Sequence, residues 1–377
     1  MNFTRRDFGK LAMAAAPAAA GLSIPGMGLA AQSSKLDGVQ IGAITYSFRQ
    51  GVVKTDLPSI MQKIGLSEVE LMSGDAEAIA GIPSAGGGGG GGRGGSGGGR
   101  GGGRGGSGGG RGPVALAPNG CPTNTPSGQD SVAKSGQAPA RGGGPGGGGG
   151  GRAMTPEQEA AQKAIADWRM AAKPATWKAV RQKFNDAGID VQILCYNMGL
   201  TAKDDEIEYA FQMARDLGVR AISCSSTVAF AKRVAPFADK HKMMWAGHGH
   251  ADIFDDEQFA KPETFKKIIS FGKYMGVNLD IGHFTAAGFD PVAFIPEIHD
   301  RITNLHIKDR MKPDKCYASP NVEWGKGETP IKEVLMLMKK NKYKFPANIE
   351  FEYQTPQGSD SVIEVGKCYE YIKKCFA

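Results

Sequence analysis

The chain has 377 residues, 56 of them glycine, and 41% of its residues are hydrophobic. About 30 of the glycines lie in two tracts, Gly86 to Gly112 and Gly142 to Gly151, where glycine does not recur at every third position as a collagen helix requires. The net charge of +7 is concentrated in the N-terminal leader and in residues 83–154. The remainder is close to neutral, so its composition gives no reason to expect an anionic partner.

The first 32 residues are typical of an export signal. Thr4-Arg5-Arg6-Asp7-Phe8 precedes an apolar run from Leu11 to Leu22 and the small residues 28–31. This order resembles a twin-arginine signal with cleavage after Ala30 or Ala31. The alternative is a membrane anchor, but the run is short and rich in Ala and Gly. We therefore expect a periplasmic or otherwise exported protein with no stable membrane insertion after the signal is removed.

From Leu36 onward, predicted strands and helices alternate. In chain order, the strand–helix units are Val39–Thr45 with Lys54–Gly65, Glu68–Leu71 with Thr155–Ala187, Asp190–Tyr196 with Asp204–Leu217, Val219–Ser225 with Val228–Lys240, Met243–Gly247 with Pro262–Met275, Val277–Ile281 with Pro291–Asp300, Ile302–Ile307 with Thr329–Lys340, and Ala347–Phe351 with Ser361–Lys374. Eight such units in about 270 residues predict a (β/α)8 TIM barrel. A doubly wound open sheet is the alternative, but the turn after the first strand lacks the glycines of a phosphate-binding loop.

The glycine-rich segment, residues 84–154, interrupts the barrel (residues 36–83 and 155–377) after the second strand. In a TIM barrel this loop opens on the catalytic face. Gly-Arg-Gly-Gly-Ser repeats cannot bury apolar area, so we expect a disordered arm near the pocket mouth. Such tracts often bind RNA, but export favours a solvated spacer or loose contact with anionic polysaccharide.

Six cysteines are widely spaced, with no C-x-x-C pair. In an oxidising compartment a bridge such as Cys368 to Cys375 is compatible with the sequence, although spacing alone does not establish it. Cys195 and Cys224 lie in apolar strand-like runs, which favours buried free thiols.

Histidines and acids cluster near the ends of the last four predicted strands. All six histidines lie between His241 and His306. The side chains at or beyond these strand ends are His248 and His250, Asp280 and His283, His306 with Lys308 and Asp309, and Glu350 with Glu352. Barrel enzymes place their catalytic groups at the carboxyl ends of the strands, so this recurrence predicts one shared polar site.

The chemistry of this set is that of a divalent metal. Imidazole and carboxylate ligands suit Mn²⁺, Zn²⁺, Co²⁺ or Fe²⁺, and the cluster contains no thiolate of the kind found in structural zinc sites. Glu350 and Glu352 share one strand face, so both point inward or both outward. Asp280 and His283 meet if the chain bends after the strand, which Gly282 allows.

The motifs together resemble the xylose-isomerase-like TIM-barrel superfamily, in its sugar phosphate isomerase/epimerase branch. The motifs are His-Gly-His at 248–250, Leu-Asp-Ile-Gly-His at 279–283, His-Ile-Lys-Asp at 306–309, Ile-Glu-Phe-Glu at 349–352, Tyr-Ser-Phe-Arg at 46–49, Val-Glu-Leu at 69–71 and Trp-Gly-Lys-Gly at 324–327. The similarity covers the chain except for the leader and the glycine-rich segment.

This resemblance implies a divalent metal cofactor (Mn, Co, Zn or Mg) and roles for particular residues. The metal ligands would be Asp280, His306 and Glu350, with His248 where the family commonly has a glutamate. The catalytic residues would be Glu350, His248, His283 and Lys308, and the substrate-binding residues Glu70, His250, Arg49 and Glu352. For Glu70, the alternative is a salt bridge at the bottom of the barrel.

The resemblance also implies a reaction. The metal polarises a carbonyl, a base removes the neighbouring carbon-bound proton, and an enediolate forms. Reprotonation gives an isomerase or epimerase acting on an unphosphorylated sugar or keto-sugar. Loss of a leaving group would instead give a 3-keto-glycoside lyase, and the non-enzymatic alternative is a carbohydrate-binding barrel. We expect a small carbohydrate as partner and no nucleic acid, since the core lacks a basic groove.

Overall fold

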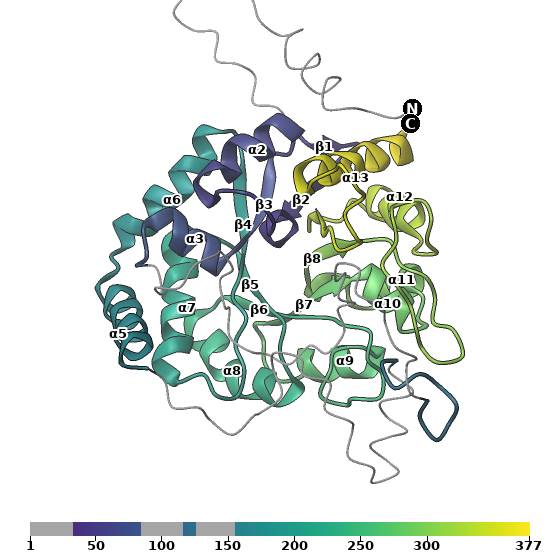
Figure 1. Ribbon diagram of the computed structural model, residues 1–377, viewed down its shortest axis with the longest axis horizontal. Coiled ribbons are helices and arrows are strands. Elements are labelled where there is room, and N and C mark those ends of the chain that lie inside the picture. Colours follow the sequence, from purple (N-terminus) through teal and green to yellow (C-terminus); the bar gives the residue numbers. More distant parts are fainter. Residues whose placement is uncertain (1–32, 84–115, 126–154) are drawn as a thin grey trace, which may run out of the picture. The chain divides into compact units, whose positions relative to one another are not determined.

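The computed structural model describes residues 33–83, 116–125 and 155–377. Eight parallel strands form a closed barrel, because the last strand pairs with the first. They are β2 (Val39–Ile44), β3 (Glu68–Met72), β4 (Asp190–Cys195), β5 (Ala221–Cys224), β6 (Met244–His248), β7 (Met275–Asp280), β8 (Ile302–Ile307) and β9 (Ala347–Ile349). The predicted (β/α)8 TIM barrel is confirmed, and Figure 1 shows its ring of helices around the strands.

Every predicted strand lies within two residues of an observed one. A further short strand, β1 (Lys35–Leu36), pairs antiparallel with β2. Within the barrel, neighbouring strands place Asp280 opposite His306 and His306 opposite Asn348. Because side chains alternate along a strand, this register decides which polar groups face each other inside the barrel.

Helices surround the barrel. The α-helices are α2 (Leu57–Ile64), α3 (Ser73–Ala80), α5 (Pro156–Ala171), α6 (Pro174–Asp186), α7 (Asp204–Leu217), α8 (Val228–His241), α9 (Pro262–Ile269), α10 (Ile281–Ala286), α11 (Pro291–Ile298), α12 (Ile331–Asn341) and α13 (Ser361–Phe376), and the 3-10 turns are η1 (Thr45–Phe48), η2 (Lys54–Asp56) and η3 (His299–Arg301). Thr155 caps α5 in a capping box with Gln158. Gly218 follows α7 in the left-handed conformation, so the helix ends at Leu217, the predicted residue.

Two predicted helices differ from the structure. The helix predicted over Thr155–Ala187 is two helices, because a residue before proline avoids the helical conformation and Lys173 before Pro174 is extended. The helix predicted over Pro262–Met275 ends at Ile269, since Met275 already belongs to β7 and pairs with Trp245 of β6. Helices α3 and α10 were not predicted.

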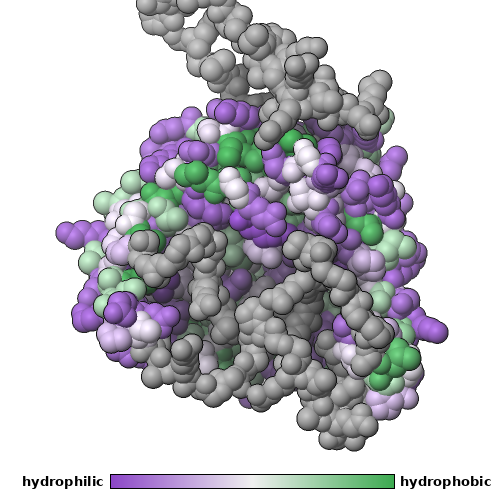
Figure 2. All heavy atoms as spheres, viewed as in Figure 1, coloured by the Kyte–Doolittle hydropathy of each residue, from purple (hydrophilic) through white to green (hydrophobic). Residues whose placement is uncertain are grey.

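The core is formed by apolar side chains between the strands and the helices, including the fully buried Trp177, Trp245 and Phe230. Figure 2 shows hydrophilic residues around the outer ring of helices, with smaller hydrophobic patches between them. Within the described ranges, none of the helices combines the length and the apolar character needed to cross a bilayer.

The predicted leader, residues 1–32, lies outside the described residues, as does most of the predicted insertion. The exception is the segment 116–125, in which Leu116 and Pro122 form an antiparallel bridge. A disulfide joins Cys121 of this segment to Cys316, between β8 and α12. The bridge suggested for Cys368 and Cys375 was wrong, since both are buried free thiols, whereas Cys195 and Cys224 are free and buried as predicted.

Candidate metal centre and active site

The four predicted metal ligands meet at the carboxyl ends of the strands. His248 ends β6, Asp280 ends β7, His306 is in β8, and Glu350 directly follows β9. All four are buried, and each offers one ligand atom within 4.8 Å of the others. The register places Asp280 opposite His306, whereas His248 lies opposite Asn278 and Glu350 lies two residues beyond Asn348, the partner of His306. The four ligands therefore come from neighbouring levels of the barrel interior.

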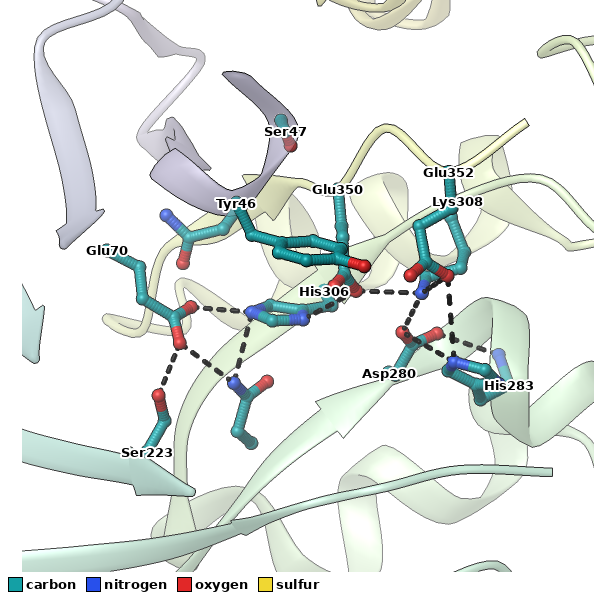
Figure 3. Close-up of polar contacts among 12 residues, drawn as sticks. Tyr46, Ser47, Glu70, Ser223, Asp280, His283, His306, Lys308, Glu350 and Glu352 are labelled. Atoms are coloured by element: carbon teal, nitrogen blue, oxygen red, sulfur yellow. Dashed lines mark hydrogen bonds and ion pairs between the residues drawn. The ribbon is translucent and has the colours of Figure 1, made fainter. Parts of the chain in front are cut away.

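His306 is held by two carboxylates (Figure 3). Its Nε2 lies 2.5 Å from Glu70 Oε2, and its Nδ1 lies 2.8 Å from Glu350 Oε2. Burial lowers the pKa of His306, but the two neighbouring carboxylates outweigh burial and raise it well above its ordinary value. The arrangement has the form of a carboxylate–histidine pair that fixes the orientation of a metal-ligating imidazole.

Glu70 has protein partners on both oxygens. Oε1 accepts hydrogen bonds from Ser223 Oγ and from Asn278 Nδ2 at 3.3 Å. Oε2 contacts His306 and accepts a bond from Asn304 Nδ2 at 2.7 Å. Glu70 has no exposed surface. The substrate contact predicted from the sequence would therefore require one of these contacts to break.

Lys308 is buried among three acidic side chains (Figure 3). Its Nζ lies 2.9 Å from Asp280 Oδ2, 2.7 Å from Glu350 Oε2 and 2.6 Å from Glu352 Oε2. Burial lowers the pKa of Lys308, and the three carboxylates more than reverse this, so the side chain stays an ammonium. Burial also raises the pKa of Glu350, but Lys308 and His306 bring it well below its usual range. Both Glu350 and Glu352 therefore point inward, one of the two arrangements that the sequence allowed.

One of the four ligands, His248, also forms a neutral group with two further histidines, His250 and His283. The rings of His248 and His250 are 5.0 Å apart between centroids, and those of His250 and His283 are 5.2 Å apart. Burial lowers the pKa of all three, to about 4 for His250. Neutral imidazoles are the form that binds metals and accepts protons. The Arg310 guanidinium contacts His283 Nδ1.

The donor set fits a divalent metal. Asp280 Oδ1 caps α10 by accepting the His283 backbone N–H at 2.7 Å, which fixes the carboxylate. The other oxygen, Oδ2, forms an ion pair of 2.9 Å with the Lys308 ammonium but no hydrogen bond, and the buried His248 Nδ1 has no hydrogen-bond partner among the described residues. Two imidazoles and two carboxylates with spare acceptor atoms suit Zn²⁺, Mn²⁺ or Co²⁺. Burial raises the pKa of Asp280 to about 7, since a buried carboxylate needs a nearby cation to stay ionised.

The outer part of the site contains Glu352, Arg49 and Tyr46. The Glu352 side chain is 19% exposed, more than Glu350 at 6%, so Glu352 is the more accessible carboxylate. Arg49 donates a hydrogen bond of 2.7 Å to the Phe351 carbonyl and stacks over the Tyr46 ring at 4.6 Å. The part of Arg49 in substrate binding stays a prediction, and Tyr46 adds an aromatic surface beside it.

A layer of polar side chains beneath the ligands was missed. Asn278, Asn304 and Asn348 are completely buried, and each precedes a predicted ligand by two residues. Asn304 Nδ2 donates to Asn348 Oδ1 at 3.2 Å, and Asn278 Nδ2 lies 3.1 Å from His306 Nε2. The sequence could have predicted this layer, because residues two apart on a strand share a face and each asparagine therefore points the same way as the ligand that follows it.

The chain matches the family described as xylose isomerase-like TIM barrel over residues 153–367. No curated protein sequence matches it. Among solved structures, a xylose isomerase domain containing protein from Salmonella typhimurium LT2 has a TM-score of 0.52 at 9% identity, covering 91% of this chain and 99% of the other.

Two other structures are similar at the level of the fold. A sugar phosphate isomerase/epimerase from Parabacteroides distasonis has a TM-score of 0.50 at 13% identity, covering 89% of this chain and 94% of the other. A probable 3-DHS dehydratase involved in petrobactin synthesis in Bacillus anthracis has a TM-score of 0.50 at 10% identity, covering 89% and 98%. Because the family match spans more than half of its length, the chain belongs to the xylose isomerase-like TIM-barrel family.

Proposed function

We propose that the protein is a metal-dependent isomerase or epimerase that acts on an unphosphorylated sugar or keto-sugar through an enediolate. The observation that carries this proposal is the buried group of His248, Asp280, His306 and Glu350 at the catalytic end of the barrel. Membership of the family and the fold shared with a sugar phosphate isomerase/epimerase support the same reaction class.

The metal would be held by these four residues and would supply Lewis acidity to the substrate carbonyl. A base takes the proton from the carbon beside the carbonyl, the electron pair of that C–H bond forms a carbon–carbon double bond, and the π pair of the carbonyl moves to its oxygen. Glu350 and two neutral histidines, His248 at the end of β6 and His250 two residues beyond it, are the candidate bases. Return of the proton to the neighbouring carbon gives isomerisation, and its return to the opposite face gives epimerisation.

Elimination is the second candidate reaction. The same enediolate can expel a leaving group on the next carbon, and one of the structural neighbours is named a probable dehydratase. A 3-keto-glycoside would be the matching substrate, with the glycosidic oxygen leaving and taking up a proton. The Lys308 ammonium, next to the more accessible Glu352, is the group that would supply that proton.

The experiment is hydrogen exchange in D₂O. We expect the Zn²⁺- or Mn²⁺-loaded protein to incorporate deuterium beside the carbonyl of a ketose or a 3-keto-glycoside, as detected by NMR after chelation of the metal. Released aglycone would identify elimination. Asp280→Asn should abolish both metal binding and exchange. Asp290→Asn is the matched control, because Asp290 caps α11 as Asp280 caps α10 but lies outside the metal group.

Metal-loaded protein that binds carbohydrate but exchanges no deuterium with any of these compounds would instead favour the carbohydrate-binding barrel. Equal loss of metal in both variants would show that the cap, rather than the ligand, had been disturbed.

We also propose that the protein is exported through its twin-arginine-like leader. The disulfide between Cys121 and Cys316 supports an oxidising compartment, since cytosolic proteins rarely keep such bonds. Replacing Arg5 and Arg6 by lysine should hold the protein in the cytoplasm with both thiols reduced. Unchanged secretion, measured by cell fractionation, would contradict the assignment of the leader.

A further inference from the structure

Lys308 brings a positive charge into the metal centre itself. Its ammonium contacts Asp280 Oδ2 and Glu350 Oε2, and both residues belong to the group that would hold the metal. The side chain is 2% exposed, so water does not screen these contacts. Because like charges repel strongly where the dielectric is low, an ammonium and a divalent ion held by the same two carboxylates weaken each other's binding.

The three contacts of the ammonium differ in kind. The contact with Glu352 is a hydrogen bond of 2.6 Å, to a side chain that is 19% exposed. The contact with Asp280 Oδ2 is an ion pair of 2.9 Å that lacks the angles of a hydrogen bond. The contact with Glu350 Oε2 is 2.7 Å long, and this oxygen is shared with His306 Nδ1. The ammonium can therefore leave Asp280 and Glu350 and still keep its bonded partner.

We propose that Lys308 is an internal cation that competes with the divalent metal, so that metal binding transfers its ammonium from Asp280 and Glu350 to Glu352 alone. This inference rests on the metal centre of the proposed function. The transfer would deliver the ammonium to the more accessible carboxylate, whose Oε2 lies 3.9 Å from His283 Nε2. Metal occupancy would then set the position of the charge that faces the substrate.

The aliphatic part of the Lys308 side chain packs against Gly282, which leaves space for the ammonium to move. Gly282 lies in the first turn of α10, and a β-carbon at that position would collide with Lys308 Cγ and the Lys308 carbonyl oxygen. The glycine gives the aliphatic chain room beside the helix while the ammonium changes partners.

The first test is the affinity of the full-length, metal-free protein for Mn²⁺, measured by titration calorimetry. Lys308→Met removes the competitor and keeps an unbranched side chain, so Mn²⁺ should bind at least about tenfold more tightly. The control is Lys54→Met, which removes a lysine paired with Asp75 outside the metal group. Its affinity should stay within about twofold of wild type. Equal or weaker Mn²⁺ binding by Lys308→Met would overturn the proposal.

A double-mutant cycle tests the destination of the ammonium. Glu352→Gln should weaken Mn²⁺ binding in the wild-type background, because the displaced ammonium loses its partner. The same substitution should have a clearly smaller effect in the Lys308→Met background, where no ammonium needs that partner. Equal effects in the two backgrounds would contradict transfer to Glu352.

If Lys308→Met fails to fold, the NMR signal of Lys308 in the wild-type protein tests the same proposal. In protein labelled with ¹³Cε-lysine, the Lys308 resonance, assigned with Lys308→Arg, should move as Zn²⁺ is added. A resonance that stays fixed while calorimetry records Zn²⁺ binding would refute the competition and leave the proposed function intact. Absence of metal binding in wild type and in every variant would overturn both. Tighter binding by Lys308→Met without deuterium exchange would support this inference alone.

Discussion

Glu68 and Glu70 lie two residues apart on β3, and both carboxylates are completely buried inside the barrel. Glu70 has four partners, whereas Glu68 accepts a bond from Asn348, and its Oε1 has none among the described side chains. Burial raises the pKa of Glu68 well above 4.5, and the charge of Glu70 adds to this. Gly42 on β2 makes room for the carboxylate, since a β-carbon there would overlap Glu68 Oε2.

The raised pKa of Glu68 should make the free energy of unfolding depend on pH. A folded-state pKa raised above the unfolded value contributes stability that is present below the unfolded pKa and lost as pH rises through the folded one. Glu68→Gln should therefore match wild type near pH 4 and be more stable than wild type at pH 8. Urea unfolding at both pH values measures this. The exposed Glu370→Gln on α13 is the control, with the same small effect at both.

The ligand positions could be predicted from the sequence because His306, Asp280 and Glu350 each fall near the end of an apolar strand. The contacts of Lys308 could not, since its partners come from β7 and from the chain beyond β9, and their meeting depends on strand register. The four partners of Glu70 come from three other strands for the same reason. Polar pairing across a barrel is a property of the closed sheet rather than of any one segment.

At the scale of elements, one ion pair joins the two helices that flank the insertion. Arg169 on α5 bonds both oxygens of Glu77 on α3, at 2.7 and 2.9 Å, and Tyr209 of α7 donates to Glu77 at 3.0 Å. The Glu77 side chain is 4% exposed and that of Arg169 32%. The pair fixes α5, which has no buried residues of its own, against α3 and α7.

Replacing Arg169 should lower the free energy of unfolding. Arg169→Met leaves the Glu77 carboxylate buried with Tyr209 as its remaining donor, and we expect a loss of about 2 kcal/mol, less than for a fully buried pair because the arginine is partly exposed. Lys163→Met on the same helix breaks an exposed pair with Asp167 and should cost less than about 0.5 kcal/mol. Urea denaturation of both variants compares them, and equal losses would contradict the structural role of the buried pair.

The bounds of the helices were predicted correctly where local sequence signals are strong. Proline in the first helical turn marked the start of α5, and glycine after the last turn marked the end of α7. Helix α3 was missed because it is short and adjoins the glycine tract, and α10 because it begins directly after β7 with Asp280 as its cap. The end of α9 was misplaced because pairing of Met275 with β6 overrides helical periodicity.

At the scale of the whole molecule, the disulfide connects parts of the chain that are 195 residues apart in sequence. No spacing rule could have identified Cys121 and Cys316 as partners, since the insertion and the loop after β8 meet only in the folded barrel. Tyr317, next to Cys316, packs edge-on against Phe254 at 5.1 Å between centroids, so the bridged loop also contacts the loop after β6.

Loss of the disulfide should destabilise the protein. Closing a long loop restricts the unfolded chain, and such bonds typically contribute about 2–4 kcal/mol. The double variant Cys121→Ser, Cys316→Ser should lose stability in this range, as measured by guanidinium denaturation. Wild type reduced before unfolding is the control and should match the variant. Deleting Gly86 to Gly151 removes Cys121, so the deletion variant should also lose the stability that the disulfide contributes.

The position of Cys121 divides the insertion into two stretches with different covalent consequences. A sequence-specific protease site placed within residues 126–154 would yield two pieces that stay linked, one carrying Cys121 and the other Cys316. The same site within residues 84–115 would leave both cysteines on one piece and release the other in denaturing, non-reducing gels. Only a cut in the later stretch therefore leaves the two pieces joined by the disulfide, and the tolerance of the insertion to proteolysis should differ between its two stretches.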